Sequence, residues 1–136
     1  MNIPNTSKPR IVIIGGGFAG ISFIKQLQKE DVQLVLFDKH NYHTFQPLLY
    51  QVSTAGLEPD SIAYPLRKIF RSNKNFPFRL AEVNKILPSE NKISTSIGDL
   101  TYDYLILATG TRTNFFGNDE IEEKSMPMKT VSSTVT

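Results

Sequence analysis

The sequence predicts an α/β fold of three layers: a central parallel sheet, helices on one side and an antiparallel β-meander on the other. Three observations predict it. A β-branched run at residues 10–14 ends on three glycines and leads through a helical pattern to a second apolar run. Such a strand–helix–strand unit requires a parallel pair with a right-handed crossover. Several short strand-like runs follow over residues 76–102, and a last apolar run ends on small residues at Gly110.

The first half of the chain is expected to carry the parallel pair. Residues 10–14 (RIVII) lack polar alternation, which suits a strand buried on both faces. Apolar positions recur at helical spacing over about residues 18–29, so we expect a helix there. Residues 32–37 are a second apolar run that closes at Asp38. Residues 39–60 show no clear period, and a connection of this length is more often functional than spare.

The second half is expected to supply one helix and the remaining strands. Asp60 or Ser61 is a candidate helix cap, with Pro65 in the first helical turn. The meander is expected over residues 85–102, because turn-forming clusters divide this segment into short runs. The strands expected in the central sheet are residues 10–14, 33–38, 79–83 and 104–109.

Composition excludes several classes of function. The chain has 136 residues, so we expect residues 1–136 to form a single domain. Fifteen Lys plus Arg against thirteen Asp plus Glu give a net charge of +2, too small to indicate nucleic-acid binding. The absence of cysteine excludes disulfides, thiolate metal ligands and a cysteine nucleophile. No long apolar run and no signal-peptide pattern occur, so we expect no membrane span and a cytoplasmic protein.

The pattern Gly15-x-Gly17-x-x-Gly20 predicts a phosphate-binding loop. It follows a strand and opens a helix, whose N-terminus offers free N–H groups and a partial positive charge. The first glycine permits a tight turn, the second lets backbone approach a pyrophosphate, and the third lets the helix pack on the strand. The other residues of the predicted loop are Gly16, Phe18 and Ala19.

Asp38 completes the predicted dinucleotide site, eighteen residues past Gly20 and at the end of the next strand. A carboxylate there can accept hydrogen bonds from ribose hydroxyls and would repel a 2′-phosphate, which argues against NADP. The alternative is a glycine turn without a ligand and an exposed aspartate. The order of strand, glycines, helix, strand and acid favours the dinucleotide, but it does not separate NAD from FAD, because both contain ADP.

Three segments resemble type II NADH:quinone oxidoreductases, flavoproteins of the pyridine nucleotide-disulfide oxidoreductase-like superfamily. They are residues 38–52 (DKHNYHTFQPLLYQV), 61–67 (SIAYPLR) and 102–110 (YDYLILATG), and the similarity runs over about residues 10–130. The resemblance implies a Rossmann-like FAD-binding domain, incomplete relative to the family. It also implies a function: passing electrons from NADH through FAD to quinone.

The resemblance assigns further residues to the cofactor. It places the FAD pyrophosphate over the glycine loop, the adenosine ribose on Asp38 and the adenine near the backbone of Val83. The turn formed by Ala108, Thr109 and Gly110 passes close to the cofactor, where small residues admit the approach. The candidate flavin contacts, for which solvated loop residues are the alternative, are Lys39, Thr44 and Gln46.

We expect no catalytic and no metal-ligating residue in this chain. His40 and His43 lie three positions apart without a nearby cysteine, which is more typical of loop hydrogen bonding than of a metal or acid–base site. Replacing His43 by alanine is therefore expected to leave FAD binding nearly intact. The lack of cysteine also excludes the thiol–disulfide chemistry of related reductases.

The resembling proteins are much longer and carry a second glycine fingerprint for NADH, which this sequence does not contain. We therefore expect the chain alone to be inactive in turnover, since hydride transfer needs both cofactors in register. The alternative is a non-catalytic module that keeps only the fold. A chain shorter than the resembling proteins should expose sheet edge and apolar surface that those proteins cover, which predicts a homo-oligomer. The alternative is a monomer whose tail, from about Asn118 onward, folds back as a cover. As part of a longer peripheral membrane protein, the chain would lie at the inner face of the membrane.

Overall fold

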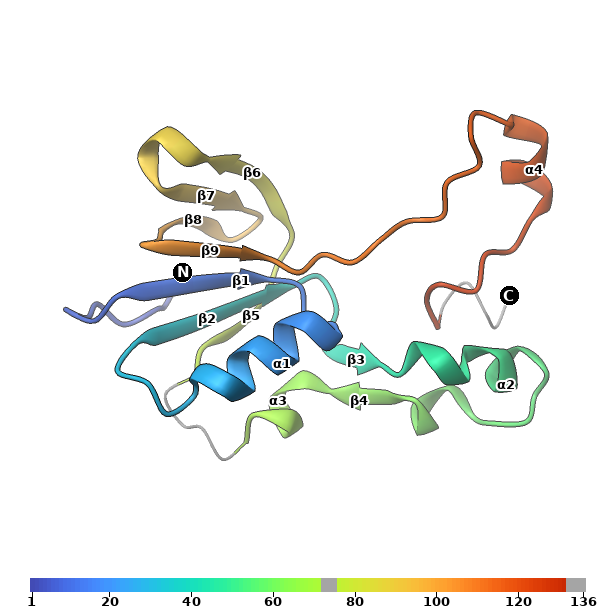
Figure 1. Ribbon diagram of the computed structural model, residues 1–136, viewed down its shortest axis with the longest axis horizontal. Helices are drawn as coiled ribbons and strands as arrows, with labels where there is room; N and C mark the ends of the chain where they lie inside the picture. Colours follow the sequence, from blue (N-terminus) through green and yellow to red (C-terminus); the bar gives the residue numbers. More distant parts are fainter. Residues whose placement is uncertain (72–75, 132–136) are drawn as a thin grey trace. The chain divides into compact units, whose positions relative to one another are not determined.

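The structure of the protein is a computed structural model that describes residues 1–71 and 76–131 (Figure 1). Within this part, the chain forms two compact units. The first contains Met1–His43 and Pro65–Thr109, and the second contains Thr44–Tyr64 and the described residues from Gly110 onward.

The first unit is built on a four-stranded sheet of order β5-β2-β1-β9, in which every neighbouring pair is parallel. In the centre, Ile14 lies opposite Phe37 on one side and Leu107 on the other. The strands are β1 (Arg10–Ile14), β2 (Gln33–Asp38), β5 (Phe78–Leu80) and β9 (Tyr104–Leu107). The parallel sheet predicted from the sequence is confirmed.

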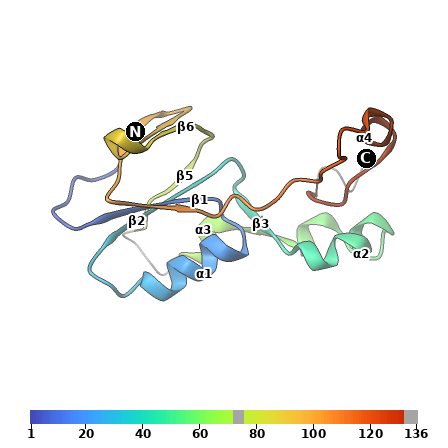
Figure 2. The same cartoon turned by 45° about the horizontal axis from the view of Figure 1, so that its top comes forward.

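Helix α1 (Phe18–Leu27) and the short helix α3 (Leu66–Ile69) cover one face of this sheet (Figure 2). Alternate residues of β1 point to opposite faces, so Ile13 packs with Ile24 of α1, whereas Val12 packs in the core on the other side. Ile24 is fully buried, and burial of such a side chain contributes about 1.5–3 kcal/mol.

The opposite face of the sheet carries an antiparallel meander of β6 (Val83–Leu87), β7 (Lys92–Thr95) and β8 (Gly98–Thr101). Ile93 of β7 is fully buried and packs in the same cluster as Val12 of β1. Helices, parallel sheet and meander therefore form the three layers that the sequence predicts.

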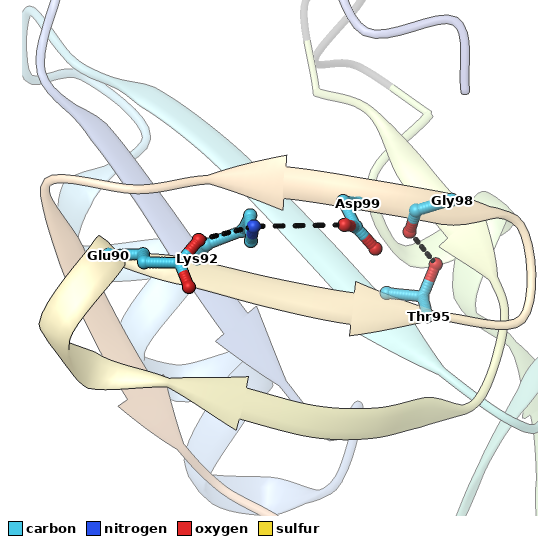
Figure 3. Close-up of polar contacts among 5 residues, drawn as sticks. All are labelled: Glu90, Lys92, Thr95, Gly98 and Asp99. Carbon is cyan, nitrogen blue, oxygen red and sulfur yellow. Dashed lines mark hydrogen bonds and ion pairs between the residues drawn. The ribbon is translucent and has the colours of Figure 1, made fainter.

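Polar contacts close the turns of the meander (Figure 3). Lys92 lies between Glu90 and Asp99 and forms an ion pair with each. The hydrogen bond to Glu90, followed by the charges of both acids, raises the pKa of Lys92. Thr95 is buried and donates its hydroxyl to the Gly98 carbonyl (2.6 Å), which stabilises the turn between β7 and β8.

The second unit has a small core of its own. Helix α2 (Leu49–Ser53) buries Leu49 and Val52 against Ile62. Helix α4 (Asp119–Lys124) begins at Asn118, whose side chain accepts a hydrogen bond from the Ile121 N–H (3.1 Å). Two further strands, β3 (Tyr42–Thr44) and β4 (Ala63–Pro65), form a two-stranded sheet, and each has residues in both units.

Several predicted boundaries are wrong. The parallel strand expected at residues 79–83 ends at Leu80; the Ala81 N–H still bonds to the Asp38 carbonyl (2.9 Å), and Val83 already opens β6 of the other sheet. An apolar run cannot reveal such a change of sheet. Pro65 ends β4 and caps α3 instead of lying in a first helical turn, since a residue that precedes proline, here Tyr64, favours extended backbone.

Other predicted segments differ in length or content. Helix α1 ends at Leu27, two residues before the predicted end. Residues 39–60, expected without regular structure, contain β3 and the five-residue helix α2, an element too short to show a sequence period. No helix in the described ranges is long and apolar enough to cross a membrane.

Candidate functional site

The glycine loop joins β1 to α1 and is held by the strands on both sides of β1. The Gly15 N–H donates to the Phe37 carbonyl (2.8 Å), and the Ala108 N–H donates to the Ile14 carbonyl (2.8 Å). Gly15 has a φ of +108°, and a Cβ atom there would overlap the Ala108 carbonyl oxygen. Only glycine satisfies both requirements.

Gly20 and Gly17 are glycines for different reasons. A Cβ atom on Gly20 would overlap the Gly15 carbonyl oxygen, so its absence lets α1 pack directly on the loop. A Cβ atom on Gly17 would meet nothing within 4 Å, and its φ of −77° is open to any residue. The protein's own packing therefore does not require Gly17 to be glycine. The open space at Gly17, which we call the cradle, leaves room for a ligand to approach the backbone of the loop, so the loop fits a pyrophosphate.

The N-terminus of α1 faces this cradle without a capping side chain. Gly17 is the N-cap, so the first turn receives no side-chain hydrogen bond from it, and no acidic residue lies in that turn. A helix start of this kind attracts anions through its N–H groups and its dipole. Gly17, Phe18 and Ala19 are exposed, as a binding edge requires.

Asp38 links the end of β2 to the glycine loop. One carboxylate oxygen accepts the Gly16 N–H (2.5 Å), and the other accepts the His40 N–H (2.7 Å). A carboxylate has about four lone-pair sites, so these two bonds leave acceptor capacity for the hydroxyls of a ribose. Asp38 is half-buried beside the loop, which is the position expected from the sequence.

The other predicted site residues are divided between the two units. Thr109 also lies against Gly15, beside Ala108, while Lys39 is exposed directly after Asp38. Val83 begins β6 and is partly buried against the meander-side core. The second unit contains Thr44, Gln46 and Gly110. Within the first unit the structure thus brings together the glycine loop, Asp38 and the turn after β9.

Two residues near the loop were not predicted as site residues. Leu66 is fully buried, and its methyl groups would lie 2.7 and 2.9 Å from a Cβ atom on Gly16, so Leu66 packs directly against the loop. His43 contacts the Gly16 carbonyl oxygen (Nδ1 to O, 3.2 Å). Both lie in segments that resemble the flavoprotein family, and this was the only signal in the sequence that could have indicated them. The described residues contain no group of three or more His, Asp or Glu placed to hold a metal ion.

Comparison with protein families supports what the loop geometry indicates. The family model for pyridine nucleotide-disulphide oxidoreductases matches residues 9–135, nearly the whole chain. The chain belongs to this family. The family predicted from the sequence is confirmed, and membership supports FAD as the predicted cofactor. Because the chain has no cysteine, the disulfide chemistry in the family's description does not come from its residues.

Similar proteins include NADH:quinone and NAD(P)H-ubiquinone oxidoreductases. The chain is 41% identical over 130 residues to the type II NADH:quinone oxidoreductase NdhA of Mycobacterium tuberculosis, covering 93% of this chain and 28% of the relative. It is 34% identical over 137 residues to the mitochondrial external alternative NAD(P)H-ubiquinone oxidoreductase B2 of Arabidopsis thaliana, covering 93% of this chain and 24% of the relative. The chain spans less than a third of the length of the relatives it matches.

Solved structures share the fold. NDH2 of Plasmodium falciparum, solved in complex with NADH, superimposes with a TM-score of 0.84 at 23% identity, over 94% of this chain and 27% of that one. The sulfide:quinone oxidoreductase of Aquifex aeolicus superimposes equally well, at 0.84 and 27% identity, over 93% of this chain and 30% of that one. These matches confirm the fold class predicted from the sequence.

Proposed function

We propose that this chain is the FAD-binding portion of a flavoprotein NADH dehydrogenase that passes electrons from NADH through FAD to quinone. The observation that carries the proposal is the open cradle at Gly17. The protein's own packing does not require a glycine at position 17, which is the uncapped start of α1. The preceding residue, Gly16, donates its N–H to Asp38. A site of this form suits the ADP half of a dinucleotide.

The residues of the chain bind and orient the cofactor. The first-turn N–H groups of α1 bind the pyrophosphate, Asp38 accepts hydrogen bonds from the adenosine ribose, and the backbone near Val83 contacts the adenine. When bound, the flavin supplies the redox chemistry by accepting electrons from NADH and passing them to quinone. Lys39, Thr44, Gln46 and the turn Ala108–Gly110 are proposed as further contacts. The Asp38 carboxylate disfavours a ribose with a 2′-phosphate, so NADP is not expected in this cradle.

The chain by itself is proposed to bind FAD without catalysing turnover. It has one glycine fingerprint, whereas hydride transfer requires flavin and nicotinamide to be held in register. A cytoplasmic position, at the inner face of the membrane as part of a longer protein, stays a prediction.

A visible absorption spectrum tests the proposal directly. The purified 136-residue chain, reconstituted with FAD and freed of excess by gel filtration, should be yellow and should release FAD on denaturation. NADH consumption with added FAD and a soluble quinone should stay at background. A colourless protein after reconstitution would favour the alternative, a module that keeps the fold without the cofactor. Robust NADH oxidation would contradict the proposal that this chain is inactive alone.

A further inference from the structure

His43 contacts both neighbours of the open glycine. Its Nδ1 atom lies 3.2 Å from the Gly16 carbonyl oxygen, and its ring packs edge-to-face against Phe18, with ring centroids 4.7 Å apart and planes at 87°. Gly16 precedes Gly17, and Phe18 follows it. One imidazole, half-buried at β3, therefore touches the chain on either side of the cradle.

The chemistry of this contact is defined by the carbonyl. A carbonyl oxygen only accepts hydrogen bonds, so Nδ1 carries the proton in this bond. The Gly16 carbonyl and the Gly17 N–H belong to the same peptide group, which is planar and trans. Holding the carbonyl toward His43 therefore directs the Gly17 N–H to the opposite side.

The preceding peptide of the loop is held as well, since Asp38 accepts the Gly16 N–H at 2.5 Å. Glycine has more backbone freedom than any other residue, so a loop of three glycines requires outside contacts to keep its amides aligned. Asp38 supplies such a contact before Gly16, and His43 supplies one after it.

We propose that His43 is a positioning residue that presets the Gly17 N–H for an anionic phosphate group by holding the Gly16 carbonyl. The inference rests on the proposed function, because the phosphate is that of the dinucleotide. It reverses the expectation from the sequence alone, in which His43 was a dispensable hydrogen bonder.

A matched pair of variants of the 136-residue chain tests this role. His43→Asn keeps an N–H donor near the position of Nδ1, whereas His43→Leu has the same branched shape without a donor. The control is His40→Leu, because the ring of His40 packs against Tyr42, with ring centroids 5.4 Å apart. FAD affinity is measured by the quenching of flavin fluorescence, and the backbone order parameter of the Gly17 amide is measured by NMR relaxation on the ligand-free chain.

We expect His43→Leu to weaken FAD binding by roughly three- to tenfold, as the loss of one neutral hydrogen bond implies. It should also lower the order parameter of the Gly17 amide, because the Gly16–Gly17 peptide is then held less firmly, while His43→Asn and His40→Leu stay close to the wild type in both measurements. Equal affinity and equal order parameters in the Asn and Leu variants would overturn the proposal. If the Leu variant does not fold, His43→Ala replaces it under the same criteria.

The two measurements separate this inference from the proposed function. If the wild-type chain binds no FAD, the proposed function fails, but the order parameter of the Gly17 amide still shows whether the donor at position 43 holds the loop. If FAD binds and position 43 has no effect on either measurement, the positioning role fails alone.

Discussion

Replacing Gly17 by valine should separate ligand binding from folding. A Cβ atom on Gly17 meets no other atom within 4 Å, and its φ of −77° with ψ of −169° is extended backbone that a β-branched residue adopts readily. Valine is a poorer N-cap than glycine, so we expect a loss of up to about 1 kcal/mol in the free energy of unfolding. The variant should therefore fold, with a melting temperature only a few degrees lower.

The effect on FAD binding should be much larger. The isopropyl group of Gly17→Val would occupy the space through which a pyrophosphate approaches the first-turn N–H groups of α1. Hydrogen bonds to a charged group contribute about 1.5–3 kcal/mol each. Losing two of them costs roughly 3 kcal/mol or more, which corresponds to at least about a hundredfold in affinity. Titration of the apoprotein with FAD, followed by flavin fluorescence, measures this loss.

Gly20→Ala is the matched control, because its added methyl group would overlap the Gly15 carbonyl oxygen and force α1 away from the loop. Overpacking of this kind costs about 1–3 kcal/mol, so Gly20→Ala should lower the melting temperature more than Gly17→Val does. A Gly17→Val chain that binds FAD like the wild type would show that the site is misplaced. A Gly17→Val chain that unfolds, beside a stable Gly20→Ala chain, would show that the two roles are assigned to the wrong glycines.

Two further predictions concern association and alkaline stability. Strand β9 pairs only with β1 among the described strands, and its Tyr104 and Leu107 are 61% and 62% exposed. We therefore expect a dimer or higher oligomer. Light scattering that shows a monodisperse monomer at high concentration would contradict this. Because folding raises the pKa of Lys92, the ion pairs of Lys92 should stabilise the fold fully below the ordinary lysine pKa of 10.5, and this stabilisation should disappear as pH rises through the raised pKa. The melting temperature of Lys92→Met should therefore be below that of the wild type at pH 7 and approach it at high pH; a gap that does not change with pH would rule out the charge as its cause.

The sequence alone was enough to predict the first βαβ unit and its glycine loop. The strand at residues 10–14, the loop and the start of α1 are contiguous, so their periodicity and glycine spacing are local signals. Asp38 was found in the same way, because an acid at the end of the second strand has a fixed relation to the loop. The meander followed from the spacing of its turns.

Only the tertiary structure showed which distant residues contact the loop. Gly15 must be glycine because Ala108, far along the chain, passes directly beside it, and His43 reaches Gly16 from a segment without a readable period. Likewise, the boundary between β5 and β6 exists because β5 pairs in the four-stranded sheet and β6 in the three-stranded sheet. Such contacts join residues distant in sequence, and their distances are set by the packing of the layers, so no local pattern records them.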